Sequence, residues 1–254
     1  WPSVTGAAIT GRLSQQARLP QVPIKQAQTR GFRFQYDQDP ATIVSIGSHG
    51  YSVLELRSSG MEVFRENNRC SQGTGNFLRQ LVGRFSLSVG EASELCADVE
   101  KSATLSGRCP VILKTDMTHL ANKGEDRAAI LAGLFDAICK NVMVLIKPDK
   151  SPKRVVLIGG VSQSRRIQRV FRQSFEELGM SLVPNHTEDA LFIEALGSAL
   201  VASEIGEAPP SLERLLAPPR KNALERLPAL GDSLGLVHRL KGVPMADVKG
   251  QSRR

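Results

Sequence analysis

Strand-like apolar segments open the chain, and apolar residues at helical spacing follow them. Residues 42–46 form a short apolar run, residues 51–56 begin to alternate, and residues 61–65 form a third strand candidate. A Ser-Ser-Gly turn at 58–60 separates the last two. The pattern therefore predicts three short antiparallel strands in succession.

Helical spacing dominates the chain from residue 74 to residue 203. The clearest helix ends before Pro148, and Gly124 closes the helix that precedes it. The predicted helices cover residues 24–30, 74–85, 90–104, 116–122, 125–146, 165–178 and 189–203. Further strands are predicted at residues 3–9, 111–113, 154–158 and 182–184. Strands that are followed by alternating helices and strands indicate an α/β fold.

Residues 154–162 combine an apolar strand with a Gly-Gly-Val-Ser turn that leads into a helix. Such a unit presents backbone amides and a helix N-terminus, to which a nucleotide can bind. Two glycines after a strand also serve tight packing of the strand against a helix. Both interpretations are open for Gly159, Gly160 and Val161.

The composition is that of an ordinary globular protein, with 254 residues, 41% hydrophobic and 23% charged. No apolar run approaches the roughly 20 residues of a membrane span, and the first residues lack the pattern of a signal peptide. The four cysteines are widely spaced, so we expect a cytoplasmic protein in a reducing compartment, without a membrane partner.

The first residue is tryptophan, and we expect a fragment or a degenerate lobe of a longer protein. The expected division is a remnant of a preceding lobe with its connection at 1–40, one main lobe at 41–205, and a basic, proline-containing linker or tail at 206–254. Half of the net charge of +8 lies in that tail, which has nine Lys/Arg and five Asp/Glu. No RNA-binding aromatic motif or zinc finger accompanies the charge, so we expect no nucleic-acid partner.

Two cysteines stand where a loop is expected to pass into a helix. Cys70 precedes a Gly-Thr-Gly turn, and Cys109 precedes a proline. The positive end of a helix dipole favours the thiolate form, which binds metals, and Gly73 and Gly75 leave backbone amides open to an anion. A cysteine is also commonly a small buried hydrophobe, and this alternative is open for both thiols.

Other reactive side chains lack such a setting. Cys96 and Cys139 fall inside predicted helices, and we expect them in the core. His119 lies on a predicted helix and is expected at the surface. His49 lies in a predicted turn, where it is either an exposed loop residue or a group that orients water or phosphate.

Three separated segments match known motifs. Residues 70–78 read Cys-Ser-Gln-Gly-Thr-Gly-Asn-Phe-Leu, residues 109–116 read Cys-Pro-Val-Ile-Leu-Lys-Thr-Asp, and residues 159–162 read Gly-Gly-Val-Ser. In this order they resemble the Cys-Ala-Ala-Gly-Thr-Gly-Arg-Phe-Leu, Cys-Thr-Val-Phe-Ala-Glu-Ser-Glu and adenosine motifs of the activator ATPases of 2-hydroxyacyl-CoA dehydratases, the BadF/BadG/BcrA/BcrD family. The resemblance runs from about Val4 to Ala202.

The resemblance implies a ribonuclease H-like lobe of the acetate-kinase, sugar-kinase, heat-shock-chaperone and actin superfold. It also implies that the chain binds ATP with magnesium. Cys70 and Cys109 would be ligands of a [4Fe-4S] cluster, and because such a cluster takes four thiolates, two chains would share it as a homodimer. The residues that the resemblance assigns to the nucleotide are Gly47, Gly73, Thr74, Gly75, Gly159, Gly160 and Val161.

Two departures from the family pattern count against ATP hydrolysis. The family motif Asp-Ile-Gly-Gly-Gln-Asp-Ser-Lys corresponds to residues 45–52, Ser-Ile-Gly-Ser-His-Gly-Tyr-Ser, of which Ile46 and Gly47 match. Ser45 lacks the charge that the family's first aspartate supplies to magnesium and the attacking water. The family's amino-terminal Asp-x-Gly-Ser motif is absent.

The favoured hypothesis is an ATP-dependent iron–sulfur activator, which donates a low-potential electron to an acyl-CoA dehydratase or reductase. The alternative is a catalytically decayed scaffold or binding domain on the same nucleotide fold, with structural cysteines and no cluster. A sugar or acetate kinase is the least favoured, because it would need an aspartate near position 45.

Overall fold

The structure is a computed structural model, and the described residues are 3–67, 74–106, 109–184, 189–217 and 230–236. The chain divides into two units, 1–217 and 218–254. In the second unit the structure describes η4 (Leu230–Leu236), a short 3-10 helix. Within the described ranges, no helix is both long enough and apolar enough to cross a membrane.

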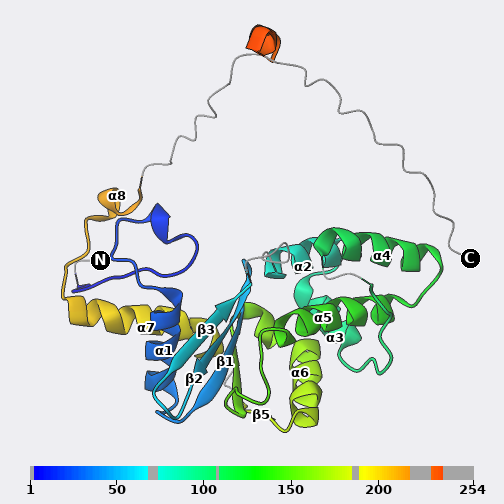
Figure 1. The fold of residues 1–254 in the computed structure, drawn as a ribbon, viewed down its shortest axis with the longest axis horizontal. Helices are drawn as coiled ribbons and strands as arrows, with labels where there is room; N and C mark the ends of the chain where they lie inside the picture. Colours follow the sequence, from blue (N-terminus) through cyan, green and yellow to red (C-terminus); the bar gives the residue numbers. More distant parts are fainter. Residues whose placement is uncertain (1–2, 68–73, 107–108, 185–188, 218–229, 237–254) are drawn as a thin grey trace, which may run out of the picture. The chain divides into compact units, whose positions relative to one another are not determined.

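A mixed sheet lies at the centre of the first unit (Figure 1). Its described strands are β1 (Ala41–Ile46), β2 (Tyr51–Leu56), β3 (Glu62–Glu66), β4 (Arg154–Ile158) and β5 (Ser181–Leu182), in the order β3-β2-β1-β4-β5. The first three pair antiparallel. The pairs β1–β4 and β4–β5 are parallel, so the carboxyl ends of β1 and β4 lie at the same edge.

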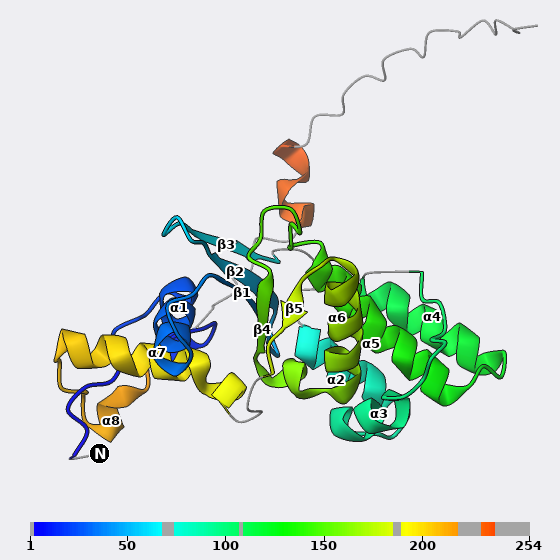
Figure 2. The ribbon, with the colours of Figure 1, turned by 90° about the horizontal axis from the view of Figure 1, so that it is seen from below.

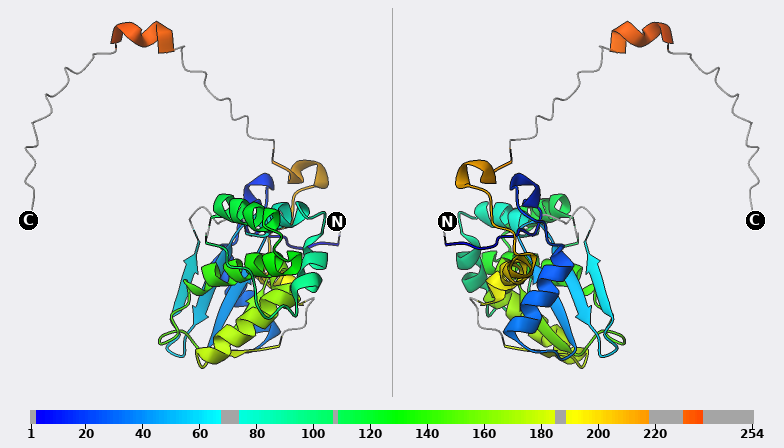
Figure 3. Two further views of the ribbon diagram at one scale, coloured as in Figure 1. Left: turned by 90° about the vertical axis from the view of Figure 1, so that its right-hand side faces the viewer. Right: turned by 90° about the vertical axis from the view of Figure 1, so that its left-hand side faces the viewer.

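Helices cover both faces of the sheet. Figure 2 shows α1 and α7 on one face and α2 to α6 on the other, and the two views of Figure 3 look onto these layers in turn. The helices are α1 (Ile24–Gln35), α2 (Thr74–Gly83), α3 (Val89–Cys96), α4 (Pro110–Asn122), α5 (Arg127–Met143), α6 (Arg165–Glu177), α7 (Asp189–Ile205) and the short α8 (Leu212–Leu215); η1 (Ser14–Gln16) and η3 (Gly160–Gln163) are 3-10 turns.

The two layers explain why β1 is apolar on both faces. Every residue of β1 is buried. Ile43 joins a cluster with Phe32 of α1 and Ile193 of α7, whereas Val44 joins the larger cluster that contains Leu134 of α5. A central strand that is covered on both faces reads as a continuous apolar run.

Glycines allow α1 and α7 to cross in backbone contact. A Cβ atom on Gly31 would lie 2.0 Å from the Ile193 carbonyl oxygen, and one on Gly197 would lie 1.9 Å from that of Ala27. Side chains at these two positions would force the helices apart. This close crossing determines the position of α7 over β1.

A buried carboxylate ties β2 to its neighbours. Glu55 accepts hydrogen bonds from Arg57 Nε at 3.0 Å, from Ser151 Oγ at 2.6 Å, and from Arg65 of β3. Burial alone raises the pKa of this carboxyl group, but the hydrogen bonds from Arg65, Ser151 and Arg57 outweigh it, and the pKa is lowered. Glu55 therefore stays ionised and links β2, β3 and the turn before β4.

Most of the predicted elements are confirmed. The strands predicted at 42–46, 51–56, 61–65 and 154–158 agree with β1, β2, β3 and β4 to within one residue at each end. The turn at 58–60 closes with a hydrogen bond from the Gly60 N–H to the Arg57 carbonyl. The helix predicted at 116–122 ends as expected before Gly124, whose φ is +78°.

Three predicted elements are wrong. Residues 3–9 are not a buried strand, since they are exposed or half-exposed and form a single bridge, between Ile9 and Gln21. Residues 111–113 are not a strand, because α4 already begins at Pro110. The helix predicted at 90–104 ends at Cys96.

Tertiary contacts explain the last two errors. In α4, Leu113 and Met117 lie one turn apart and are both buried in the core, while Val111 is 69% exposed, so helical spacing serves the packing better than a strand would. After α3, the Ala103 N–H donates to the Ala129 carbonyl at 2.9 Å. This bond holds the segment beside α5, so the helix does not continue.

We predict that Glu55→Gln lowers the free energy of unfolding by about 2–3 kcal/mol at neutral pH, because charge-assisted hydrogen bonds are lost in a buried site. The folded-state pKa of Glu55 lies below its unfolded value of about 4.3, so this stabilisation is present above pH 4.3 and is lost as the pH falls through the folded-state pKa. Urea unfolding at several pH values measures both effects.

The matched control is Glu176→Gln, an exposed carboxylate on α6, which should change stability little at any pH. A Glu55→Gln protein whose deficit is the same at pH 7 and pH 3 would contradict the ionic role of Glu55.

Candidate functional site

The edge where β1 and β4 end gathers three segments that are distant in sequence. The Gly75 N–H, in the first turn of α2, donates to the Gly47 carbonyl after β1 at 3.1 Å. A Cβ atom on Gly75 would also lie 3.2 Å from Val161 Cγ2, after β4. The sequence-predicted nucleotide residues at this edge are Gly47, Thr74, Gly75, Gly159, Gly160 and Val161.

Two of these glycines are required by packing. Gly159 has φ +89°, and a Cβ atom there would lie 2.6 Å from the Ile46 carbonyl oxygen. A Cβ atom on Gly75 would lie 2.8 Å from Ser48 Cα. Both positions bring one backbone segment against another. Packing therefore accounts for Gly159, although its contact is with the neighbouring strand β1 and not with a helix.

Two other glycines leave room at the same edge. Among the described residues, a Cβ atom on Gly47 would meet only the Gly50 carbonyl oxygen, at 3.8 Å, and one on Gly160 would meet only Leu191 Cδ2, also at 3.8 Å. The backbone at Gly47 and Gly160 can therefore be approached by a ligand, whereas that at Gly75 and Gly159 is covered by protein.

The expectation that the Gly75 amide is open to an anion is wrong. Its N–H donates to the Gly47 carbonyl, and the next N–H, that of Asn76, donates to the Ser48 carbonyl at 3.0 Å. These bonds fasten the first turn of α2 to the turn between β1 and β2. Gly73 lies outside the described residues, so its amide stays a prediction.

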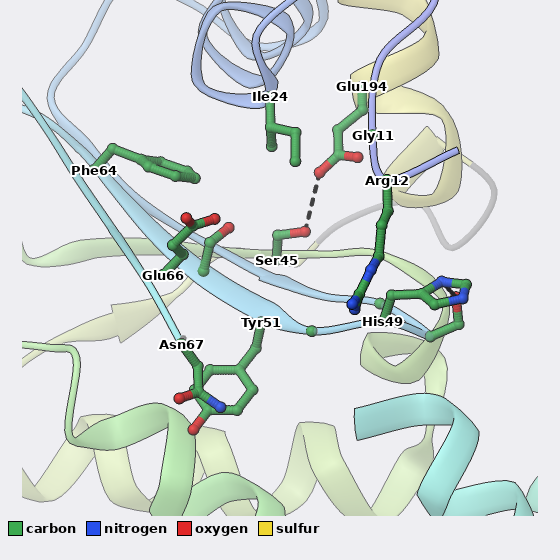
Figure 4. A pocket seen from close by; sticks show the side chains of 14 residues that line it. Gly11, Arg12, Ile24, Ser45, His49, Tyr51, Phe64, Glu66, Asn67 and Glu194 are labelled. Carbon is green, nitrogen blue, oxygen red and sulfur yellow. Dashed lines mark hydrogen bonds between the residues drawn. The ribbon is translucent and has the colours of Figure 1, made fainter. Parts of the chain in front are cut away.

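A cavity of about 460 Å³ opens beside this edge, on the face of the sheet that α1 and α7 cover (Figure 4). Glu194 of α7 accepts a hydrogen bond from Ser45 Oγ at 3.2 Å and one from Gln28 Nε2 of α1 at 2.8 Å. Gln28 Nε2 also lies 3.3 Å from Ser52 Oγ of β2. One polar network thus joins β1, β2, α1 and α7.

The outer wall of the cavity carries exposed polar side chains. His49 is exposed, and its Nδ1 lies 2.7 Å from Ser48 Oγ, so the predicted exposed loop histidine is confirmed. Its role in orienting water or phosphate stays a prediction. Figure 4 shows Arg12 extending from the amino-terminal segment into the same cavity.

Sequence reasoning missed Glu194, Gln28 and Arg12, because they come from segments outside the recognised motifs. A signal for Glu194 does exist. It lies on a helix next to Ile193 and three residues before Gly197, both buried, and a carboxylate that close to a buried stripe needs polar partners.

The cysteine thiols differ in solvent exposure, and exposure determines how readily each one forms a thiolate. Burial raises the pKa of Cys96 to about 11 and that of Cys139 well above its ordinary value, so both are poor thiolate donors. Their predicted core positions are confirmed. Cys109 is partly exposed and is the N-cap of α4.

The second predicted thiol, Cys70, lies outside the described residues. Within the described ranges, no group of three or more His, Cys, Asp or Glu side chains is arranged to hold a metal ion. A cysteine thiolate is the donor type that iron–sulfur clusters use. His119 is exposed on α4, as predicted.

The family profile described as the BadF/BadG/BcrA/BcrD ATPase family matches residues 4–202, more than three-quarters of the chain. The chain belongs to this family. Because the match runs from before β1 into α7, it contains the whole sheet edge.

Two relatives in this family are named as activators of acyl-CoA dehydratases. The (R)-2-hydroxyglutaryl-CoA dehydratase activating ATPase of Acidaminococcus fermentans is 29% identical over 161 residues, which cover 63% of this chain and 60% of that protein. The 2-hydroxyisocaproyl-CoA dehydratase activator of Clostridioides difficile is 26% identical over 194 residues, 76% of this chain and 70% of that protein. The match to the first relative thus spans less than two-thirds of its length.

The fold is also that of a solved activator. The activator of 2-hydroxyisocaproyl-CoA dehydratase from Clostridium difficile, solved with bound ADPNP, superposes with a TM-score of 0.70 at 23% identity. The superposition covers 81% of this chain and 75% of that chain. The predicted α/β fold of the ATPase type is therefore confirmed.

We predict that Gly159→Ala and Gly160→Ala differ sharply in stability. Gly159→Ala combines a left-handed backbone with a contact of 2.6 Å to the Ile46 carbonyl oxygen, so it should cost about 2–4 kcal/mol. Gly160→Ala meets nothing closer than 3.8 Å and should change stability by less than about 0.5 kcal/mol. Thermal unfolding of both variants checks this, and equal losses would contradict the division into packed and open glycines.

Proposed function

We propose that this family member is an ATP-dependent activator of an acyl-CoA dehydratase or reductase component. The observation that carries the proposal is the meeting of Gly47, Gly75 and Val161, from segments 45–52, 70–78 and 159–162, at one sheet edge. Their contacts support a single site formed by these three segments. The named activities of the two relatives give the partner class.

The nucleotide would be held at this edge. Gly47 and Gly160 leave backbone that a phosphate or sugar can approach. The positive end of the α2 dipole lies at the same edge, and α2 has no acidic residue in its first turn, although its Gly75 and Asn76 amides are used within the fold. Gly73, Thr74, Gly75, Gly159 and Val161 would shape the site. ATP with magnesium supplies the free energy for a change of conformation when it is bound.

Cys109 and Cys70 would hold a [4Fe-4S] cluster between two copies of the chain. Cys109 fits this role because it is partly exposed at the positive end of the 13-residue helix α4. Val111 and Ile112, exposed in the first turn of α4, would cover the thiol against the second copy. A bound cluster supplies one-electron chemistry at low potential, in a protein that we place in the cytoplasm.

We expect this chain to hydrolyse ATP slowly. Ser45 carries no charge, and its hydroxyl group is already engaged with Glu194. This observation favours a second candidate function, a nucleotide-fold scaffold with structural cysteines and no cluster. The domain division at residues 40 and 205 likewise stays a proposal.

We predict that the chain, prepared without oxygen, contains about four irons and four acid-labile sulfides per two copies. Cys109→Ala and Cys70→Ala should each abolish this content together with the brown colour. Cys139→Ala is the control, because its buried thiol should leave the iron content unchanged. Iron and sulfide assays with a visible spectrum measure this, and a colourless protein after reconstitution would favour the scaffold.

We also predict that Gly160→Val weakens ATP binding at least about tenfold, because its side chain would occupy the open space beside the backbone. Its melting temperature should stay close to that of the wild type. Gly83→Val is the control, since Gly83 ends α2 with no atom of the described residues within 4 Å of its Cβ position. Isothermal titration measures the affinities, and unchanged binding by Gly160→Val would contradict this placement of the nucleotide.

A further inference from the structure

Glu194 presents a carboxylate to the cavity beside the nucleotide edge (Figure 4). Its Oε1 accepts hydrogen bonds from Ser45 Oγ at 3.2 Å and from Gln28 Nε2 at 2.8 Å. Within the described residues, Oε2 has no hydrogen bond and the carboxylate has no ion-pair partner within 4.0 Å. One oxygen is therefore anchored, and the other is available.

Burying these polar groups lowers the stability of the fold unless a ligand compensates for their lost hydration. Gln28 is completely buried, and its Oε1 lacks a hydrogen-bond partner in the described part of the chain. Ser45 and Ser52 are also buried. Arg12 lines the same cavity, but no described cation forms an ion pair with the half-buried Glu194. A polar network with one negative charge that lacks an ion-pair partner can be stabilised by a ligand.

The position of Glu194 indicates the chemistry of that ligand. Ser45 is one residue from the end of β1, so the carboxylate lies over the same edge as the open backbone of Gly47. An anionic nucleotide at this edge would be repelled by Glu194 unless a cation stood between them. Magnesium typically takes one or two protein carboxylates and completes its shell with phosphates and waters.

We propose that Glu194 holds the divalent cation of a bound nucleotide and supplies from α7 the carboxylate that Ser45 lacks. The proposal rests on the nucleotide site of the proposed function. The donor set fits, because a single anchored carboxylate is enough for a cation that arrives with phosphates. Ser45 and Gln28 act as positioning residues, which hold Oε1 through their hydrogen bonds.

The test measures the affinity of Mn²⁺ for the chain saturated with ATP, by electron paramagnetic resonance, together with ATP binding in EDTA. Glu194→Gln keeps the shape of the side chain and removes its charge. It should weaken Mn²⁺ binding at least about tenfold and should leave ATP binding in EDTA unchanged or slightly tighter.

Two further variants sharpen the result. Glu204→Gln is the matched control, because it changes an exposed carboxylate at the far end of the same helix, and it should bind Mn²⁺ like the wild type. Ser45→Asp combined with Glu194→Gln moves the charge back to β1, and it should recover most of the lost affinity.

The outcomes separate the two proposals. Mn²⁺ affinity that is equal in Glu194→Gln and wild type, with ATP bound to both, would overturn the role of Glu194 and leave the nucleotide site intact. Wild-type chain that binds no ATP, with or without a metal, would overturn the proposed function and this inference with it. Equal losses in Glu194→Gln and Glu204→Gln would also count against a specific role.

Discussion

The parallel pairing of β1 with β4 is the constraint on which the rest of the molecule depends. It places Ser45 opposite Ile158, so the turns that follow the two strands begin at the same edge. Gly159 can then lie against the Ile46 carbonyl, and Gly75 can fasten α2 to the turn after β1. A sheet in which these strands were antiparallel would carry the same motifs at opposite edges.

Helices α1 and α7 form a wall of the cavity beside this edge. Gly31 and Gly197 let α1 and α7 meet in backbone contact, which brings Gln28 and Glu194 over Ser45. The glycines in this molecule therefore have two structural roles. Some, such as Gly159, close contacts between backbone segments, and others, such as Gly160, leave space that a ligand can enter.

Burial divides the cysteines in a comparable way. Cys96 and Cys139 are enclosed by the core, where loss of hydration opposes the thiolate. Cys109 caps α4 at the surface, beside the exposed Val111. The same residue type thus fills the core at two positions and is partly exposed at a third, and only its place in the fold distinguishes these environments.

The sequence by itself determined β1 to β4, most helices and the resemblance to the family, because hydrophobic periodicity and short motifs are local properties. Residues 111–113 show the limit of sequence patterns. An apolar triplet fits a strand or a helix, and only the packing of Leu113 in the core shows that it is helical. Tertiary structure alone decided that the Gly75 amide is used within the fold and that Glu194 lies within hydrogen-bonding reach of Ser45. Both depend on contacts between segments that are far apart in the chain, which no local pattern records.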